Sequence, residues 1–340
     1  MNTLELPVTY PFISVYPKHA IPFSFLTNRD SFEPWLMSNY IQLKCSTTFM
    51  THPTDAFDFF TVYPEFYETP PLQTERLVLE TVQRIQPNFT EFIQKSLMQG
   101  KYIYTHLDEF YIPDTPSYGK NTSPHANLIY GFNDRDRTFN IGGYNENLKY
   151  TFKKISYSQL EESSKSIVHI VQNQSPEIWH DFYKFIYMIK YRELTHYTLD
   201  VQWMIDQLKD YLSSSNSSGR FRGFLNKSDD FYGLEVYDKL IAYYKDKPNN
   251  SDLKPPHLIW EHKKLMLMRI EYLVSNQIIA KDQALTKVYA ELIQLSKTAQ
   301  NILIKYRILE DEQLLNKVIN IYEEIRAKEE TSLQKLLSLF

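Results

Sequence analysis

Four short runs rich in β-branched and aromatic residues constrain the fold of this 340-residue chain more than any other feature. They occupy residues 102–107, 127–132, 138–142 and 148–155, and clusters of Pro, Asn, Asp and Gly separate them. Runs of this kind, bounded by turn residues, are typical of strands. Residues 133–137 have the composition of a hairpin loop between the second and third runs. The sequence therefore predicts a small antiparallel sheet in the first half of the chain.

The pattern changes after residue 157. We expect Ser158 to cap a helix that begins at Gln159. From there to residue 340, apolar residues recur at helical spacing. The spacing is seen at Phe182, Ile186 and Ile189, and again at Leu292, Leu295, Ala299 and Ile302. The second half is therefore predicted to be helical.

Helical spacing also occurs ahead of the first strand-like run. Residues 72–99 carry apolar side chains at intervals of three and four, which predicts a helix interrupted near its middle. We therefore expect an α+β chain. Residues 1–157 would form a domain around the small sheet, and residues 158–340 would form an all-α domain.

Composition excludes several classes of function. The net charge is -4 and no long basic run is present, so a nucleic-acid partner is not expected. No stretch of 18 uncharged apolar residues and no signal-peptide pattern occur, which favours a cytoplasmic protein outside the membrane. The single cysteine, Cys45, excludes an intramolecular disulfide and a Cys-rich zinc site. No cofactor motif is found, and none is expected to be bound.

Two polar residues border the strand-like runs. His125 lies just before the second run, where it could serve as the base of a hydrolase or acyltransferase site or, alternatively, bond backbone groups at a strand end. Asp108 follows the first run. A carboxylate there could bind a substrate amine, pair with Lys120 or Arg137, or cap the following turn.

Several motifs then point to a family. They are Leu107-Asp108-Glu109-Phe110-Tyr111-Ile112-Pro113, His125, Tyr130-Gly131-Phe132-Asn133-Asp134, Pro34-Trp35-Leu36, Tyr40-Ile41-Gln42-Leu43, Tyr232-Gly233-Leu234-Glu235-Val236-Tyr237 and Trp260-Glu261-His262-Lys263-Lys264-Leu265-Met266. With them the chain resembles butirosin biosynthesis protein H and its relatives, which are papain-like acyltransferase-type proteins of antibiotic and nonribosomal peptide pathways.

The resemblance implies a papain-like N-terminal domain and a helical C-terminal domain. It implies acyl transfer in the biosynthesis of a peptide or aminoglycoside antibiotic, with a donor carried by an acyl carrier protein, and it leaves a homodimer open. The resemblance assigns the catalytic histidine to His125, and we add Cys45 and Asp108 as candidate catalytic residues. Asp108, Tyr111 and Tyr130 would contact the substrate.

The sequence departs from the family at two positions. Residues 17–21, where the resemblance places the nucleophile, read Pro-Lys-His-Ala-Ile, and the acid expected to orient His125 falls on Gly142 and Gly143. Cys45 could replace the nucleophile, although a lone cysteine is commonly a small buried hydrophobe. Ser24 could also replace the nucleophile, and Asn140 or Asn145 could replace the acid. The alternative to an enzyme is a binding or scaffold protein of such a pathway.

One further cluster has a metal-like composition. His257 and Glu261 lie four residues apart on one helical face, but His262 lies round the side and no HExxH motif is present. We therefore expect no metal site, and we expect this polar face to anchor its helix to neighbouring elements or to a partner.

Overall fold

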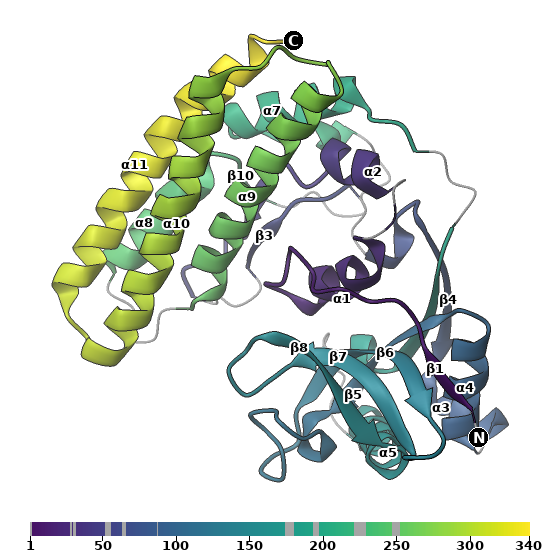
Figure 1. The fold of residues 1–340 in the computed structure, drawn as a ribbon. Helices are drawn as coiled ribbons and strands as arrows, with labels where there is room; N and C mark the ends of the chain where they lie inside the picture. Colours follow the sequence, from purple (N-terminus) through teal and green to yellow (C-terminus); the bar gives the residue numbers. More distant parts are fainter. Residues whose placement is uncertain are drawn as a thin grey trace. The chain divides into compact units, whose positions relative to one another are not determined.

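The chain divides into two compact units, neither of which is one continuous stretch (Figure 1). The sheet unit consists of residues 1–30 and 63–196, and the helical unit consists of residues 31–62 and 197–340. The computed structural model describes residues 2–27, 29, 32–51, 56–62, 66–86, 88–173, 180–192, 197–220, 229–246 and 252–340. A single boundary at residue 157 does not describe this division, because the chain passes between the units more than once.

An antiparallel sheet forms the centre of the sheet unit. Within the described residues its strands follow the order β4 (Leu72–Val78), β9 (Phe185–Tyr191), β5 (Tyr102–Asp108), β6 (Pro124–Asn133), β7 (Thr138–Tyr144) and β8 (Tyr150–Ser156), with β1 (Thr3–Glu5) pairing beside β6. Strands β5 to β8 confirm the four predicted runs and the hairpin loop after β6. The sheet is larger than predicted, because β1, β4 and β9 join it from distant parts of the sequence.

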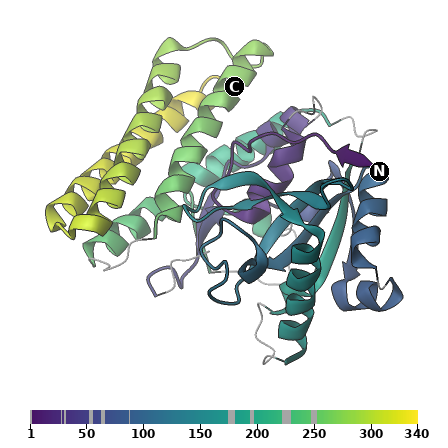
Figure 2. The ribbon, with the colours of Figure 1, turned by 60° about the horizontal axis from the view of Figure 1, so that its bottom comes forward.

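Helices cover both faces of this sheet. α4 (Phe89–Met98) and α5 (Tyr157–Asn173) contribute to one hydrophobic core with β5, and Figure 2 shows α5 in teal along the sheet. α1 (Pro17–Leu26) packs on the other face, where the Phe25 ring stacks on Tyr102 with centroids 4.4 Å apart. Alternating side chains of β5 therefore enter two separate apolar layers.

A capping box begins α5. The Ser156 hydroxyl accepts a hydrogen bond from the Gln159 backbone N–H at 3.1 Å, and the Gln159 side-chain oxygen accepts one from the Ser156 N–H at 2.8 Å. The cap therefore lies two residues before Ser158. The prediction of a capped helix here is confirmed, but the prediction that Ser158 is the capping residue is wrong, because Ser156 caps the helix.

Two segments predicted as helix are strands. β4 occupies the first part of residues 72–99, and only α3 (Leu79–Ile85) and α4 follow as helices. The helix predicted around residues 182–189 is limited to the short α6 (His180–Tyr183), and β9 follows it. Short apolar runs fit both periods, and pairing with strands that are distant in sequence decides between them. β9 pairs with both β4 and β5, so it lies inside the sheet.

Helices dominate the helical unit, and the three at its C-terminal end are long. The described α-helices are α2 (Phe32–Ser38), α7 (Val201–Leu212), α8 (Glu235–Lys245), α9 (Lys254–Ser275), α10 (Gln283–Leu309) and α11 (Glu312–Leu337). α10 packs between α9 and α11 (Figure 1). A three-stranded sheet of β10 (Phe231–Tyr232), β2 (Leu43–Cys45) and β3 (Phe57–Phe59) is also present. The prediction of an all-α second domain is therefore wrong in this respect.

A fully buried ionic cluster lies inside the helical unit. The Lys263 ammonium bonds one carboxylate oxygen of Glu329, and the hydroxyls of Tyr211 and Tyr237 donate to the other oxygen at 3.0 and 2.8 Å. Lys263 also donates to His262 Nδ1 at 2.9 Å. Burial lowers the pKa of Lys263 to about 8, although Glu329 opposes the shift. This cluster joins α7, α8, α9 and α11.

Residues 31–62 are attached to α9 by buried hydrogen bonds. Arg269 is fully buried and donates to the backbone oxygens of Met37 at 2.9 Å and Asn39 at 2.6 Å, near the C-terminal end of α2. His262 Nε2 donates to the Ile41 carbonyl at 2.8 Å. A cation favours a helix C-terminus because the carbonyl groups there lack partners within the helix. These contacts explain why an N-terminal segment belongs to the helical unit.

We expect the helical unit to lose stability in mild acid because His262 is buried in its neutral form. Burial, followed by the charge of Lys263, lowers the pKa of His262 well below 6.5. The unfolded chain takes up a proton near pH 6.5 and the folded chain does not, so stability falls as the pH drops below that value. The expected loss is about 2 kcal/mol between pH 7 and pH 5.

Urea unfolding at pH 7 and pH 5 measures this loss. Trp35, Trp203 and Trp260 all belong to the helical unit and report its unfolding by fluorescence. A His262→Gln variant should lose less stability over the same interval. An equal loss in the variant and the parent would contradict the assignment to His262.

Candidate functional site

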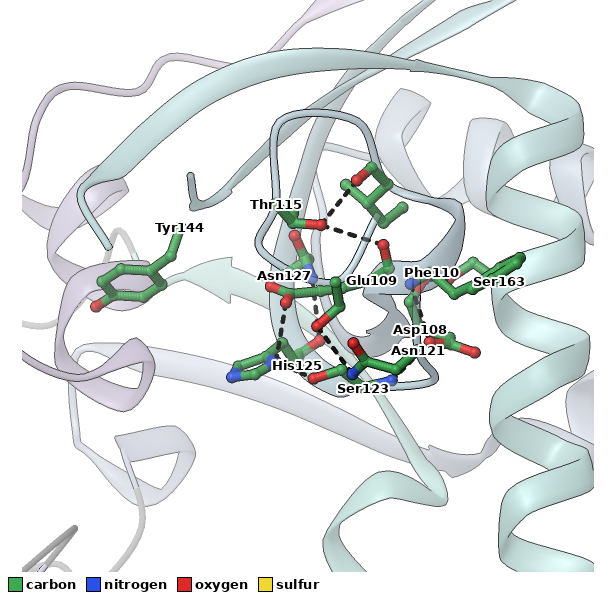
Figure 3. A network of polar contacts seen from close by, with 12 residues as sticks. Asp108, Glu109, Phe110, Thr115, Asn121, Ser123, His125, Asn127, Tyr144 and Ser163 are labelled. Carbon is green, nitrogen blue, oxygen red and sulfur yellow. Dashed lines mark hydrogen bonds and ion pairs between the residues drawn. The ribbon is translucent and has the colours of Figure 1, made fainter. Parts of the chain in front are cut away.

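The turn after β5 is closed by a buried carboxylate. Asp108 is 1% exposed, and its Oδ1 accepts hydrogen bonds from the Phe110 N–H at 3.1 Å and the Ser123 N–H at 2.9 Å (Figure 3). Its Oδ2 accepts from the Ser166 hydroxyl at 2.6 Å. Asp108 therefore joins both ends of residues 109–123 to α5. Of the alternatives in the sequence, the turn-capping contact is the one observed.

A histidine and a glutamate meet above this closed turn. His125 Nδ1 lies 3.3 Å from Glu109 Oε2 and 3.3 Å from the Ser123 hydroxyl (Figure 3). The His125 side chain is 51% exposed, whereas that of Glu109 is 5% exposed. A half-exposed imidazole thus faces a buried carboxylate, which is the arrangement that orients a general base.

Strand register places this pair. Leu107 lies opposite His125, and the Glu109 N–H extends the pairing by donating to the Ser123 carbonyl at 3.0 Å. The first residue after β5 is thereby brought against the first residues of β6. The sequence identified His125 but not Glu109 as its acidic partner. The available signal was a second carboxylate beside Asp108, and the register of β5 on β6 determines which of the two faces the imidazole.

The two glycines found where an acid was expected have steric roles. A Cβ on Gly143 would lie 2.4 Å from Asn127 Oδ1, and one on Gly142 would lie 2.4 Å from the Tyr150 hydroxyl. Asn127 in turn donates to the His125 carbonyl at 3.0 Å. The space beside β7 is therefore filled by side chains from β6 and β8, and the carboxylate near His125 comes from the β5 turn.

A lysine adds positive charge near Glu109. Lys153 Nζ donates to the carbonyls of Pro113 at 3.1 Å and Tyr144 at 3.2 Å. Burial lowers the pKa of Lys153, while Glu109 and Asp114 act in the opposite direction. Lys153 also supports the loop that carries Asp114.

A polar depression of about 280 Å³ lies beside Lys153. Its lining includes Asp114, Asn145, Thr151 and Lys153. Amide, hydroxyl and charged groups could bind the polar end of a small substrate there.

Cys45 belongs to the helical unit, whereas His125 belongs to the sheet unit. It is fully buried in β2, where Phe57 and Phe231 lie opposite it on the neighbouring strands. Burial raises its pKa to about 12, and Asp230 adds to the shift. A thiolate is the reactive form of cysteine, and this environment opposes it. The environment matches the alternative of a small buried hydrophobe.

The other candidates for nucleophile and acid have local contacts. The Ser24 hydroxyl donates to the Ile21 carbonyl at 2.6 Å inside α1. Asn140 donates to Glu5 at 3.1 Å, and Asn145 accepts from two backbone N–H groups of its own turn at 3.0 Å. Residues 17–21, where the resemblance places the nucleophile, form the first turns of α1 and contain no cysteine.

The two tyrosines expected at the substrate have different surroundings. Tyr111 is partly exposed, and its ring packs edge-on against Phe110 with centroids 5.0 Å apart. Tyr130 is 5% exposed and packs edge-on against Phe152 at 5.4 Å. Burial and the charge of Glu5 raise the pKa of Tyr130 to about 12. Tyr111 is therefore more accessible than Tyr130 to a bound molecule.

Metal-ligating side chains do not converge in the part of the chain that the structure describes. His257 bonds Glu261 at 3.0 Å, while His262 bonds the Ile41 carbonyl in the buried interior. His257 and His262 thus serve separate hydrogen-bond networks. Among the described residues, no helix has the length and apolar character needed to cross a membrane.

The His125–Glu109 pair is the candidate site of the sheet unit, and Lys153, whose pKa Glu109 affects, lines the polar depression on the same unit. Neither the protein-family models nor the curated proteins compared with this sequence give a match.

Proposed function

We propose that the sheet unit catalyses acyl transfer with His125 as general base, as an acyltransferase of secondary-metabolite biosynthesis. The observation that supports this proposal is the 3.3 Å approach of His125 Nδ1 to the buried Glu109 carboxylate. Following the resemblance to the butirosin biosynthesis protein H family, the donor would be an acyl thioester on an acyl carrier protein in the cytoplasm. The acceptor would be an amine or a hydroxyl group.

The chemistry follows from the tautomer that Glu109 selects. A carboxylate accepts a hydrogen bond, so it favours the proton on Nδ1 and the lone pair on Nε2 of His125. Nε2 removes the proton of the acceptor as its nitrogen or oxygen attacks the thioester carbonyl. The C–S bond then breaks, and the leaving thiolate takes that proton back from Nε2. Glu109 stabilises the imidazolium that exists between the two steps.

This scheme needs no cysteine nucleophile. The acceptor attacks the donor directly, so Cys45 keeps its structural place in β2. Lys153 and the polar depression beside it would bind the polar part of one substrate.

A thiol-release assay tests the proposal. The full chain is incubated with an acyl N-acetylcysteamine thioester and a primary amine. The released thiol is measured with a colorimetric thiol reagent. We expect His125→Gln to lower the rate by about 10²- to 10⁴-fold, which is the usual contribution of a general base. Glu109→Gln should lower it by a smaller factor, because the imidazole remains but loses its orienting charge.

Two matched controls separate the alternatives. Cys45→Ala should keep the parental rate. A loss of activity in this variant would support a cysteine enzyme instead. Ser123→Ala should also keep most activity. The Ser123 hydroxyl and Glu109 both contact His125 Nδ1, and Glu109 still orients the imidazole when the hydroxyl is removed. Turnover that is unchanged in His125→Gln would disprove the general-base role.

The second candidate is a binding or scaffold protein of the same kind of pathway. It is favoured by Lys18 at the start of α1, where the resemblance places a nucleophile. This candidate predicts that the parent binds a non-cleavable acyl thioether, measured by calorimetry, but releases no thiol from the thioester. Substitution of His125 would then weaken binding without changing any rate.

A further inference from the structure

Two lysines converge on one tryptophan at the surface of the helical unit. Lys264 Nζ lies 4.4 Å and Lys297 Nζ lies 4.5 Å from the centroid of the Trp260 ring. Trp260 and Lys264 are four residues apart on α9, while Lys297 comes from α10. All three side chains are partly exposed, so a solute can reach them.

The two ammonium groups lack carboxylate partners within the described residues. The ion pairs of the described chain do not include Lys264 or Lys297. Each ammonium is held by the π face of Trp260, an attraction of about 0.5–2 kcal/mol that leaves the positive charge in place. Burial lowers the pKa of Lys264, the carboxylate of Glu261 opposes this shift, and repulsion from Lys297 adds a smaller lowering effect. An anion bound between them would relieve this repulsion.

A chain of hydrogen bonds holds Lys297 in position. Lys297 donates to the Gln300 side-chain oxygen at 2.9 Å, and the Gln300 amide nitrogen lies 2.9 Å from His257 Nδ1. His257 Nε2 lies 3.0 Å from Glu261, whose side chain is 1% exposed. Each donor thus has a matching acceptor, from the lysine to the buried carboxylate. This network fixes Lys297 before any ligand binds, which lowers the entropy lost on binding.

We propose that Lys264, Lys297 and Trp260 form a binding site for a phosphate dianion, either the free ion or a phosphate monoester. Both Nζ atoms lie within 4.5 Å of one ring centroid. A phosphate has oxygens on every side and can accept hydrogen bonds from two neighbouring ammonium groups. A dianion also matches two cations in charge, which a single carboxylate does not.

Titration of the full chain with inorganic phosphate tests the site. Both ammonium groups lie against the Trp260 ring, so its fluorescence should change and saturate with phosphate, while potassium chloride at equal ionic strength should give no saturating change. Glycerol phosphate serves as the monoester probe. Tighter binding of glycerol phosphate identifies an ester as the ligand, and equal binding identifies the phosphate group alone.

Single substitutions define the residues. Lys264→Gln and Lys297→Gln should each weaken phosphate binding by about tenfold or more, because each removes a charge-assisted hydrogen bond. Lys287→Gln is the matched control, since Lys287 is an exposed lysine on the same helix α10. Calorimetry provides a readout independent of Trp260. A lack of saturable binding in the parent, or equal binding by the Lys264→Gln/Lys297→Gln double variant, would overturn the proposal.

Discussion

Glu329→Ala should lower the unfolding free energy of the helical unit by about 3–5 kcal/mol, because it leaves the buried charge of Lys263 without a counter-ion. The hydroxyls of Tyr211 and Tyr237 lose their acceptor in the same variant. Burial and the charge of Glu329 raise the pKa of both tyrosines well above 10, so both hydroxyls remain protonated donors near neutral pH. Urea unfolding followed by tryptophan fluorescence measures the loss.

A double variant distinguishes loss of the ion pair from loss of packing. Lys263→Met/Glu329→Leu removes both charges and keeps similar volumes, so it should recover much of the stability lost in Glu329→Ala. If Glu329→Ala proves as stable as the parent, or if the double variant adds the full cost of two independent losses, the buried pair is not the source of the effect.

Asp108→Ala should release residues 109–123 and lower the stability of the sheet unit by about 3 kcal/mol. The variant leaves three donors without their charged acceptor, namely the N–H groups of Phe110 and Ser123 and the hydroxyl of Ser166. Hydrogen exchange measures the effect at the Phe110 and Ser123 amides, which should exchange faster than in the parent. Tryptophan fluorescence is less suitable here, because Trp35, Trp203 and Trp260 report on the helical unit.

Ser166→Ala is the matched control for this carboxylate. It removes one of the three hydrogen bonds, so its cost should be about 1 kcal/mol and the two amides should stay protected. Fast exchange at the Ser123 amide in Ser166→Ala would show that the contact with α5, rather than closure of the turn, holds this loop.

The meander of β5 to β8 could be predicted because its signals are local. Each strand is a short apolar run bounded by turn residues, and each pairs with the next along the chain. β4 and β9 could not be predicted in this way, since their pairing joins residues more than 100 positions apart, as in Leu72 opposite Tyr191. The assignment of residues 31–62 to the helical unit and of β9 to the sheet unit likewise depends on contacts between distant parts of the sequence.

The candidate site shows the same limit at smaller scale. A histidine at a strand end can be found in the sequence, and so can the two carboxylates after β5. Which carboxylate faces His125 depends on the direction that each side chain takes after the strand ends. Asp108 turns toward the backbone of its own turn, and Glu109 turns toward the imidazole. Spacing in the sequence alone does not distinguish these outcomes.

The divided helical unit has a consequence for folding during synthesis. Arg269 binds the carbonyl of Asn39 across 230 residues of sequence, so residues 31–62 emerge from the ribosome long before α9 can cover them. The strands of the sheet unit are complete once β9 has emerged. The apolar segment that includes Phe32, Trp35 and Leu36 therefore lacks its cover from α9 during the time in which the sheet unit can already fold. Exposed apolar chain at this stage favours aggregation and chaperone binding.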